Sequence, residues 1–169
     1  MSKIIGIGGV SRSGKTWLAY KISELFQYKS ILVINQDEYV FDVEDIPKVK
    51  GETDWECPES VDFDKLLNHI QIASATNDVV IVEGLLAFYD SRIERLMDKK
   101  IFIEIPKSLF LERKVKDKRW GKFPDWYVEH IWHSYLTYGK INPPKKEYFT
   151  LKGEDIMIGD DLIAYLLDE

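Results

Sequence analysis

Residues 3–16 read KIIGIGGVSRSGKT, and this stretch decides the fold. Its first six residues form a short apolar, β-branched run, which predicts a buried strand. Residues 9–16, GVSRSGKT, then match the pattern G-x-x-x-x-G-K-[ST], whose glycines let the backbone wrap closely around a phosphate group. Apolar side chains recur at helical spacing over residues 16–28, so the loop opens a helix whose N-terminal dipole favours an anion. The sequence therefore predicts a phosphate-binding loop between a strand and a helix.

The residues of this loop are candidate contacts for the phosphates of a nucleotide. Lys15 is placed to reach the outer phosphates, and the Thr16 hydroxyl is a candidate ligand for Mg²⁺, a hard cation that prefers oxygen. Such a loop fits GTPases, ATPases, nucleotide-binding regulators and small-molecule kinases alike. The candidate nucleotide-binding residues are Gly9, Val10, Ser11, Arg12, Ser13, Gly14, Lys15 and Thr16.

Strands and helices alternate along the rest of the chain. Apolar runs at residues 31–35, 78–83 and 100–105 predict strands, and helical patterns at 63–73 and near 92–97 precede the last two. Because these strands are continuously apolar, both faces of their sheet must be covered. Further on, the pattern predicts a charged helix from Pro106 to Arg119, an aromatic helix over 125–138, a strand over 148–151 and a closing helix over 160–167.

Composition and charge narrow the class of protein. The chain has 169 residues, one cysteine (Cys57) and a formal net charge of −6, and it has no Gly/Ser linker, so we expect one domain over residues 1–169 without disulfides. The excess of acidic over basic residues disfavours non-specific nucleic-acid binding. With no apolar run typical of a signal peptide or a membrane span, we expect a cytoplasmic protein with neither nucleic-acid nor membrane partners.

Acidic residues end two of the predicted strands. Asp37 follows the strand at 31–35, and Glu83 closes the strand at 78–83, so both would lie at the carboxyl edge of the sheet near the P-loop. Asp37 is a candidate general base that also contributes to the metal shell, and Glu83 is a candidate magnesium carboxylate. Each could instead cap a turn. The absence of an N-K-x-D segment counts against a GTPase.

Four segments together resemble the uridine kinase and phosphoribulokinase superfamily, and within it the nicotinamide riboside kinases. They are GVSRSGKT at 9–16, INQDEY at 34–39, TDWECPESVDF at 53–63 and VVIVEGLLAFYD at 79–90, and the similarity runs in register from residue 3 to about residue 138. The resemblance implies an α/β P-loop fold with a five-stranded parallel sheet flanked by helices and a helical lid. It also implies transfer of the ATP γ-phosphate to a ribosyl 5′-hydroxyl with Mg²⁺.

Residue roles follow from the resemblance by position. Asp37 falls at the family's general base and magnesium-associated aspartate, Thr16 at the magnesium threonine and Lys15 at the phosphate lysine. Trp55 and Glu56 fall where such kinases contact the base and ribose of the nucleoside. Tyr39 and Val40 lie on the segment that helps to enclose the substrate.

The family's lid corresponds to residues 111–124, where arginines close over the phosphates. Arg113 matches an expected catalytic and ATP contact, whereas the second arginine is either Arg119 in a shifted register or replaced by a lysine. Residues 149–153, FTLKG, match the loop that lines adenine, but the choice between ATP and GTP and the oligomeric state are not predicted.

The leading hypothesis is an ATP- and Mg²⁺-dependent kinase that phosphorylates nicotinamide riboside in NAD salvage. Eleven acidic residues against two lysines between Asp37 and Asp64, together with the aromatic Trp55, suit a cationic pyridinium nucleoside. A uridine/cytidine kinase, or a kinase of another small hydroxylated metabolite, is the alternative within the enzyme class. A non-catalytic nucleotide-binding regulator is the alternative outside it.

Overall fold

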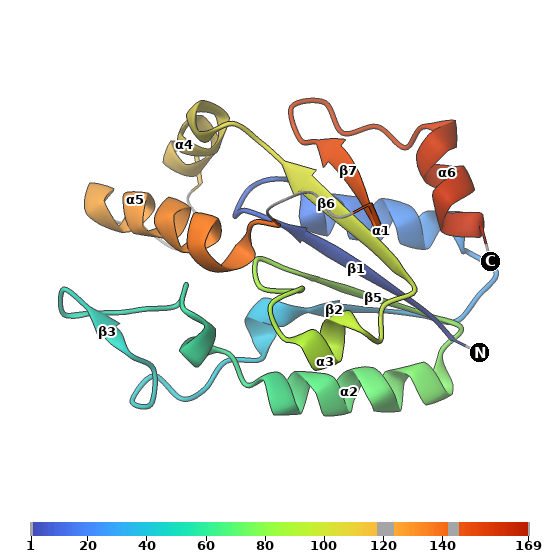
Figure 1. Cartoon of the computed structure of the whole chain (residues 1–169), viewed down its shortest axis with the longest axis horizontal. Helices are drawn as coiled ribbons and strands as arrows, with labels where there is room; N and C mark the ends of the chain where they lie inside the picture. The colour runs from blue at the N-terminus through green and yellow to red at the C-terminus, as the bar shows by residue number, and fades with distance from the viewer. Residues whose placement is uncertain (1, 118–123, 142–145, 169) are drawn as a thin grey trace.

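The central sheet has five parallel strands. The computed structural model describes residues 2–117, 124–141 and 146–168, and within them the sheet order is β2-β5-β1-β6-β7, with every neighbouring pair parallel (Figure 1). This confirms the expected doubly covered parallel sheet. The strands are β1 (Lys3–Gly9), β2 (Ile31–Asn35), β5 (Val79–Gly84), β6 (Lys99–Glu104) and β7 (Tyr148–Lys152).

Helices cover both faces of this sheet because its apolar side chains alternate between them. Ile5 and Ile7 of β1 belong to a core cluster with α1 (Lys15–Leu25) and α6 (Asp160–Leu167). Ile4 of the same strand belongs to a cluster on the other face with α2 (Phe63–Thr76) and α3 (Ser91–Glu94). The three-layer arrangement leaves the carboxyl ends of the strands open, which is where ligands of open α/β sheets bind.

A third apolar cluster lies beyond the carboxyl ends of the strands. It joins Val10 of the P-loop and Phe102 of β6 to α4 (Lys107–Val115) and α5 (Asp125–Ser134). The aromatic helix predicted over residues 125–138 ends as an α-helix at Ser134 and continues as a π-helical segment, η3 (Tyr135–Gly139). In Figure 1, α4 and α5 lie at the end of the sheet toward which the strands point.

The acidic stretch of the chain folds into short elements that the sequence pattern did not predict. A 3₁₀ turn, η1 (Gln36–Glu38), follows β2 directly. A small antiparallel hairpin follows, with β3 (Lys48–Val49) and β4 (Glu52–Thr53) as its strands, and a second 3₁₀ turn, η2 (Pro58–Ser60), leads to α2. The hairpin turn uses Lys50 and Gly51 at positive φ, 50° and 86°.

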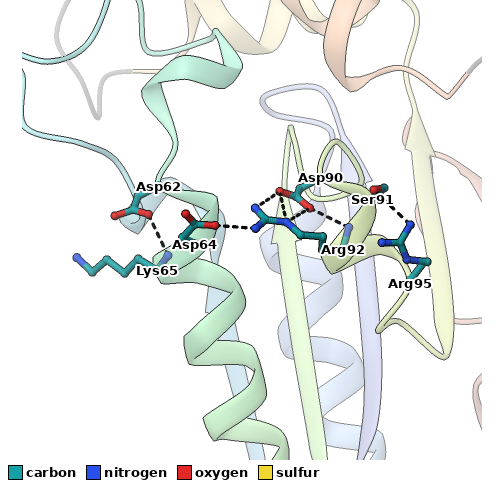
Figure 2. A network of polar contacts seen from close by, with 7 residues as sticks. All are labelled: Asp62, Asp64, Lys65, Asp90, Ser91, Arg92 and Arg95. Atoms are coloured by element: carbon teal, nitrogen blue, oxygen red, sulfur yellow. Dashed lines mark hydrogen bonds and ion pairs between the residues drawn. The ribbon is translucent and has the colours of Figure 1, made fainter.

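An exposed polar network ties the start of α2 to the start of α3 (Figure 2). The Asp62 side chain caps α2 by accepting from the Lys65 amide at 2.9 Å. Arg92 bridges Asp64, at 2.7 Å, and Asp90, at 2.6 Å. The Asp64 side chain is 83% exposed, so its ion pair with Arg92 contributes little to stability, whereas the Asp90 side chain is only 13% exposed.

Candidate active site

The P-loop has the backbone shape of a phosphate cradle. Gly9 and Gly14 adopt φ of 150° and 105°, and Arg12 adopts φ of 65°, so the chain turns tightly between β1 and α1. Helix α1 begins without a side-chain cap, which leaves the N–H groups of its first turn for an anion. Among the described residues, the buried Ser13 hydroxyl has no hydrogen-bond partner. The Ser13 hydroxyl and the uncapped amides of α1 can therefore donate hydrogen bonds to the phosphates of a nucleotide.

The two candidate magnesium residues of the P-loop and β5 contact each other. The exposed Thr16 donates from Oγ1 to Oε1 of the buried Glu83 at 2.8 Å. Lys15 donates from Nζ to the carbonyl oxygen of Val10 at 3.1 Å, so its ammonium lies over the loop. A hydroxyl held by a carboxylate is the donor set that Mg²⁺ prefers in phosphate-transfer sites.

Asp37 lies on η1, at the carboxyl end of β2. Its amide donates to Oδ1 of Asn35 at 3.0 Å, and its side chain is exposed. The preceding residue, Gln36, is buried and accepts from the Leu86 amide at 2.8 Å, which ties this turn to the segment after β5. Gln36 therefore fixes the position of the candidate base, a role that its sequence context did not reveal.

Glu56 shares one electrostatic environment with Asp37 and Lys15. Burial, and then the Asp37 carboxylate, raise the pKa of Glu56 to about 7, whereas the ammonium groups of Lys114 and Lys15 lower it. The adjacent residue, Trp55, is 41% exposed, which is unusual for a large aromatic residue. Charges on the P-loop, η1 and α4 thus act on Glu56, although these elements are far apart in sequence.

Tyr39 and Val40 follow the turn that carries Asp37 and contact different parts of the chain. The Tyr39 ring is buried in the core cluster beneath α2, and its hydroxyl hydrogen-bonds Nδ1 of His69. Val40 pairs with Val61 in an isolated antiparallel bridge. These contacts hold the segment that follows Asp37, and the role of Tyr39 and Val40 in enclosing the substrate stays a prediction.

Arg113 of α4 lies beside the P-loop. It donates to the carbonyl oxygen of Arg12 at 3.0 Å and to that of Gly153 at 2.7 Å. Arg12 in turn forms an ion pair with Asp117 at 3.8 Å. The strand predicted over residues 148–151 is confirmed as β7, which pairs with β6 and takes up residues 149–152 of the segment expected to line adenine. Arg119, with the rest of residues 118–123 of the expected lid at 111–124, lies outside the described residues.

The fold and this site define a P-loop kinase. A family model described as phosphoribulokinase / uridine kinase family matches residues 66–120. A uridine kinase of Geobacillus kaustophilus is 31% identical over 153 residues, covering 75% of this chain and 72% of that protein. A uridine kinase of Oceanobacillus iheyensis is 29% identical over 174 residues, covering 85% and 82%. The chain belongs to the uridine kinase and phosphoribulokinase family, whose members use ATP with Mg²⁺.

A solved structure shows the same fold. The structure of a possible uridine kinase from Bacillus stearothermophilus gives a TM-score of 0.58 at 17% identity, with 88% of each chain covered. At this identity the likeness concerns the fold alone. Across the described ranges of the chain, no helix is both long enough and apolar enough to cross a membrane.

Proposed function

We propose that this kinase transfers the γ-phosphate of ATP to the ribose 5′-hydroxyl of a nucleoside. The observation that carries the proposal is the shared environment of Glu56, Asp37 and Lys15. An acid suited to ribose hydroxyls, an acid suited to the attacking hydroxyl and a phosphate-binding lysine are what a nucleoside kinase needs at one place. The proposal treats residues 1–169 as one catalytic domain that acts on a small molecule in the cytoplasm.

Transfer of the phosphate group needs residues that bind the phosphates and a residue that accepts the proton of the attacking hydroxyl. The P-loop amides, Lys15 and the hydroxyl of Ser13 hold the phosphates, and Arg113 supports that loop through the Arg12 carbonyl. Thr16, Asp37 and Glu83 hold Mg²⁺, which supplies neutralisation of charge on the phosphates. Asp37 orients the 5′-hydroxyl and accepts its proton. Closure of the lid, with Arg119 within it, excludes water from the transferred group.

For the acceptor we propose nicotinamide riboside. Besides burial, the carboxylates of Asp37 and Asp54 raise the pKa of Glu56, so several acidic groups act at this position and suit a ligand of positive charge. A pyridinium ring carries that charge, and the exposed Trp55 suits it by stacking and cation–π attraction. Within the cell this reaction would serve NAD salvage.

Uridine or cytidine is the second candidate acceptor. The observation that favours it is sequence similarity, since proteins about 30% identical to this chain are uridine kinases. The same catalytic residues serve both acceptors, so the two proposals differ only in how Trp55 and Glu56 meet the base and ribose.

The test is Mg²⁺-dependent ADP release from ATP with nicotinamide riboside, uridine, cytidine and adenosine, using Asp37→Asn as the control. We expect turnover to be selective for nicotinamide riboside and to fall about 10²-fold or more in the variant, the usual effect of losing a general base. Preference for uridine or cytidine would replace the acceptor and keep the mechanism. A nucleotide-binding regulator would release no ADP in response to any nucleoside.

A further inference from the structure

Helix α5 holds the segment that carries the acceptor residues. The hydroxyl of the buried Tyr127 donates to the carbonyl oxygen of Thr53 at 3.0 Å and accepts from the amide of Trp55 at 3.2 Å. One side chain therefore satisfies two backbone groups on either side of Asp54. Both bonds are partly buried and hold the backbone on each side of Asp54, so this hydroxyl fixes the path of the chain at Trp55.

A second link leads from the same helix to Glu56. Nε2 of His130 hydrogen-bonds Oδ1 of Asp54 at 2.8 Å, and that same oxygen accepts from the Glu56 amide at 3.1 Å. The two side chains of the His130–Asp54 pair are 20% and 13% exposed, so water competes weakly for the bond. The imidazole therefore orients the carboxylate that holds the backbone of Glu56.

The hairpin before this segment contacts α5 as well. The ammonium of Lys50, at the hairpin turn, lies 4.9 Å from the centre of the Trp126 ring. The rings of Tyr127 and His130, one turn apart on α5, lie 5.7 Å apart, which orients both toward residues 53–56. Figure 1 shows the hairpin extending from the sheet on the same side as α5.

We infer that Tyr127 and His130 are positioning residues for the acceptor, acting through the backbone amides of Trp55 and Glu56. The inference rests on the proposed function, which assigns Trp55 and Glu56 to the nucleoside. Neither Tyr127 nor His130 needs to touch the substrate. Their loss loosens the segment that presents the indole face and the carboxylate, so it weakens acceptor binding and leaves the ATP side of the site intact.

Two measurements test this inference. Hydrogen exchange of the Trp55 amide, followed by NMR, is expected to be about tenfold faster in Tyr127→Phe than in the wild type, because the amide loses its acceptor. In steady-state kinetics, the KM of His130→Ala for the acceptor is expected to be about five- to tenfold higher than that of the wild type. This is the change in affinity that the loss of one hydrogen bond typically causes. The KM for ATP and kcat should stay within about twofold of the wild type.

The controls separate positioning from general damage to α5. His130→Gln keeps an N–H donor near the position of Nε2 and should restore most of the acceptor KM. His133→Gln changes an exposed histidine on the same helix, and Tyr135→Phe removes another buried hydroxyl, so both should leave the acceptor KM and the Trp55 exchange rate unchanged.

Each outcome decides a separate question. Unchanged exchange at Trp55 in Tyr127→Phe, or equal rises in the KM for ATP and for the acceptor in His130→Ala, would overturn the positioning role. A wild-type enzyme that phosphorylates no nucleoside would overturn the proposed function and with it the role toward an acceptor. If Tyr127→Phe still showed faster exchange at the Trp55 amide, the contact between α5 and residues 53–56 would be supported. The error would then lie in assigning Trp55 and Glu56 to a nucleoside.

Discussion

Thr16 and Glu83 are joined by a hydrogen bond of 2.8 Å that links the start of α1 to the end of β5. This bond sets the hydroxyl of the P-loop against a buried carboxylate. Because Glu83 is only 2% exposed, the hydroxyl of Thr16 takes a place at its carboxylate that water would hold at the surface.

Removal of the Thr16 hydroxyl should weaken the binding of Mg²⁺. In Thr16→Ala we expect the Mg²⁺ concentration for half-maximal ADP release to rise about tenfold or more, as for the loss of a metal ligand or of the group that orients it. Thr16→Ser keeps the hydroxyl and should stay close to the wild type. The same Mg²⁺ dependence in Thr16→Ala and the wild type would contradict the assignment.

Glu56 should make stability depend on pH. Its pKa is raised from 4.5 to about 7, so the folded protein holds a proton that the unfolded chain releases between these values. The stability that Glu56 contributes is therefore full at low pH and falls as pH rises from about 4.5 to about 7. The variant Glu56→Gln has no titrating group at this position, so it lacks this dependence of stability on pH.

Urea unfolding of the wild type and Glu56→Gln at pH 5 and pH 8 measures this effect. We expect the variant to gain stability relative to the wild type at pH 8 compared with pH 5. A difference between the two proteins that does not change with pH would show that Glu56 titrates normally in the folded state.

Cys57 should react slowly with thiol reagents in the folded protein. Its thiol is buried and donates to the Asp54 carbonyl oxygen at 3.3 Å, and burial, followed by the Asp54 carboxylate, raises the pKa of Cys57 from 9.0 to about 11. The thiolate fraction at pH 8 should therefore fall about 100-fold. Alkylation by iodoacetamide, followed by mass spectrometry, should be slow until urea unfolds the chain; fast labelling of the native protein would contradict this.

Gly84 should tolerate no side chain. A Cβ there would lie 2.4 Å from Oε1 of Gln36, the oxygen that accepts from the Leu86 amide. Gly84→Ala should lower the free energy of unfolding by about 2 kcal/mol through this overpacking and reduce kcat, because Gln36 precedes Asp37. In a double-mutant cycle with Gln36→Ala the two losses should be less than additive, and simple additivity would contradict the contact.

The strands and most helices could be predicted because each carries its own pattern. The continuous apolar runs of β1 and β5 and the helical spacing of α6 are local properties, and the expected bounds of α6 agree with those observed. The hairpin at residues 48–53 carries no such pattern, since its strands have two residues each. Its conformation depends on α5, which is distant in sequence.

The candidate site was predictable where backbone geometry or strand ends specify it. The P-loop and Asp37 follow directly from strands, so their positions are set by the sheet. The contacts of Tyr127 and His130 with residues 53–56 are tertiary, and an aromatic helix in sequence predicts only a core face. The contact of the Tyr39 hydroxyl with His69 of α2 is tertiary as well, and no local pattern predicts it.

The most direct test of the account is to identify the product formed from ATP, Mg²⁺ and nicotinamide riboside by ³¹P NMR and mass spectrometry. The account predicts a 5′-phosphomonoester of the nucleoside, formed in equal amount to ADP and lost in Asp37→Asn. Release of inorganic phosphate alone, or product formation that persists at the wild-type rate in folded Asp37→Asn, would contradict it.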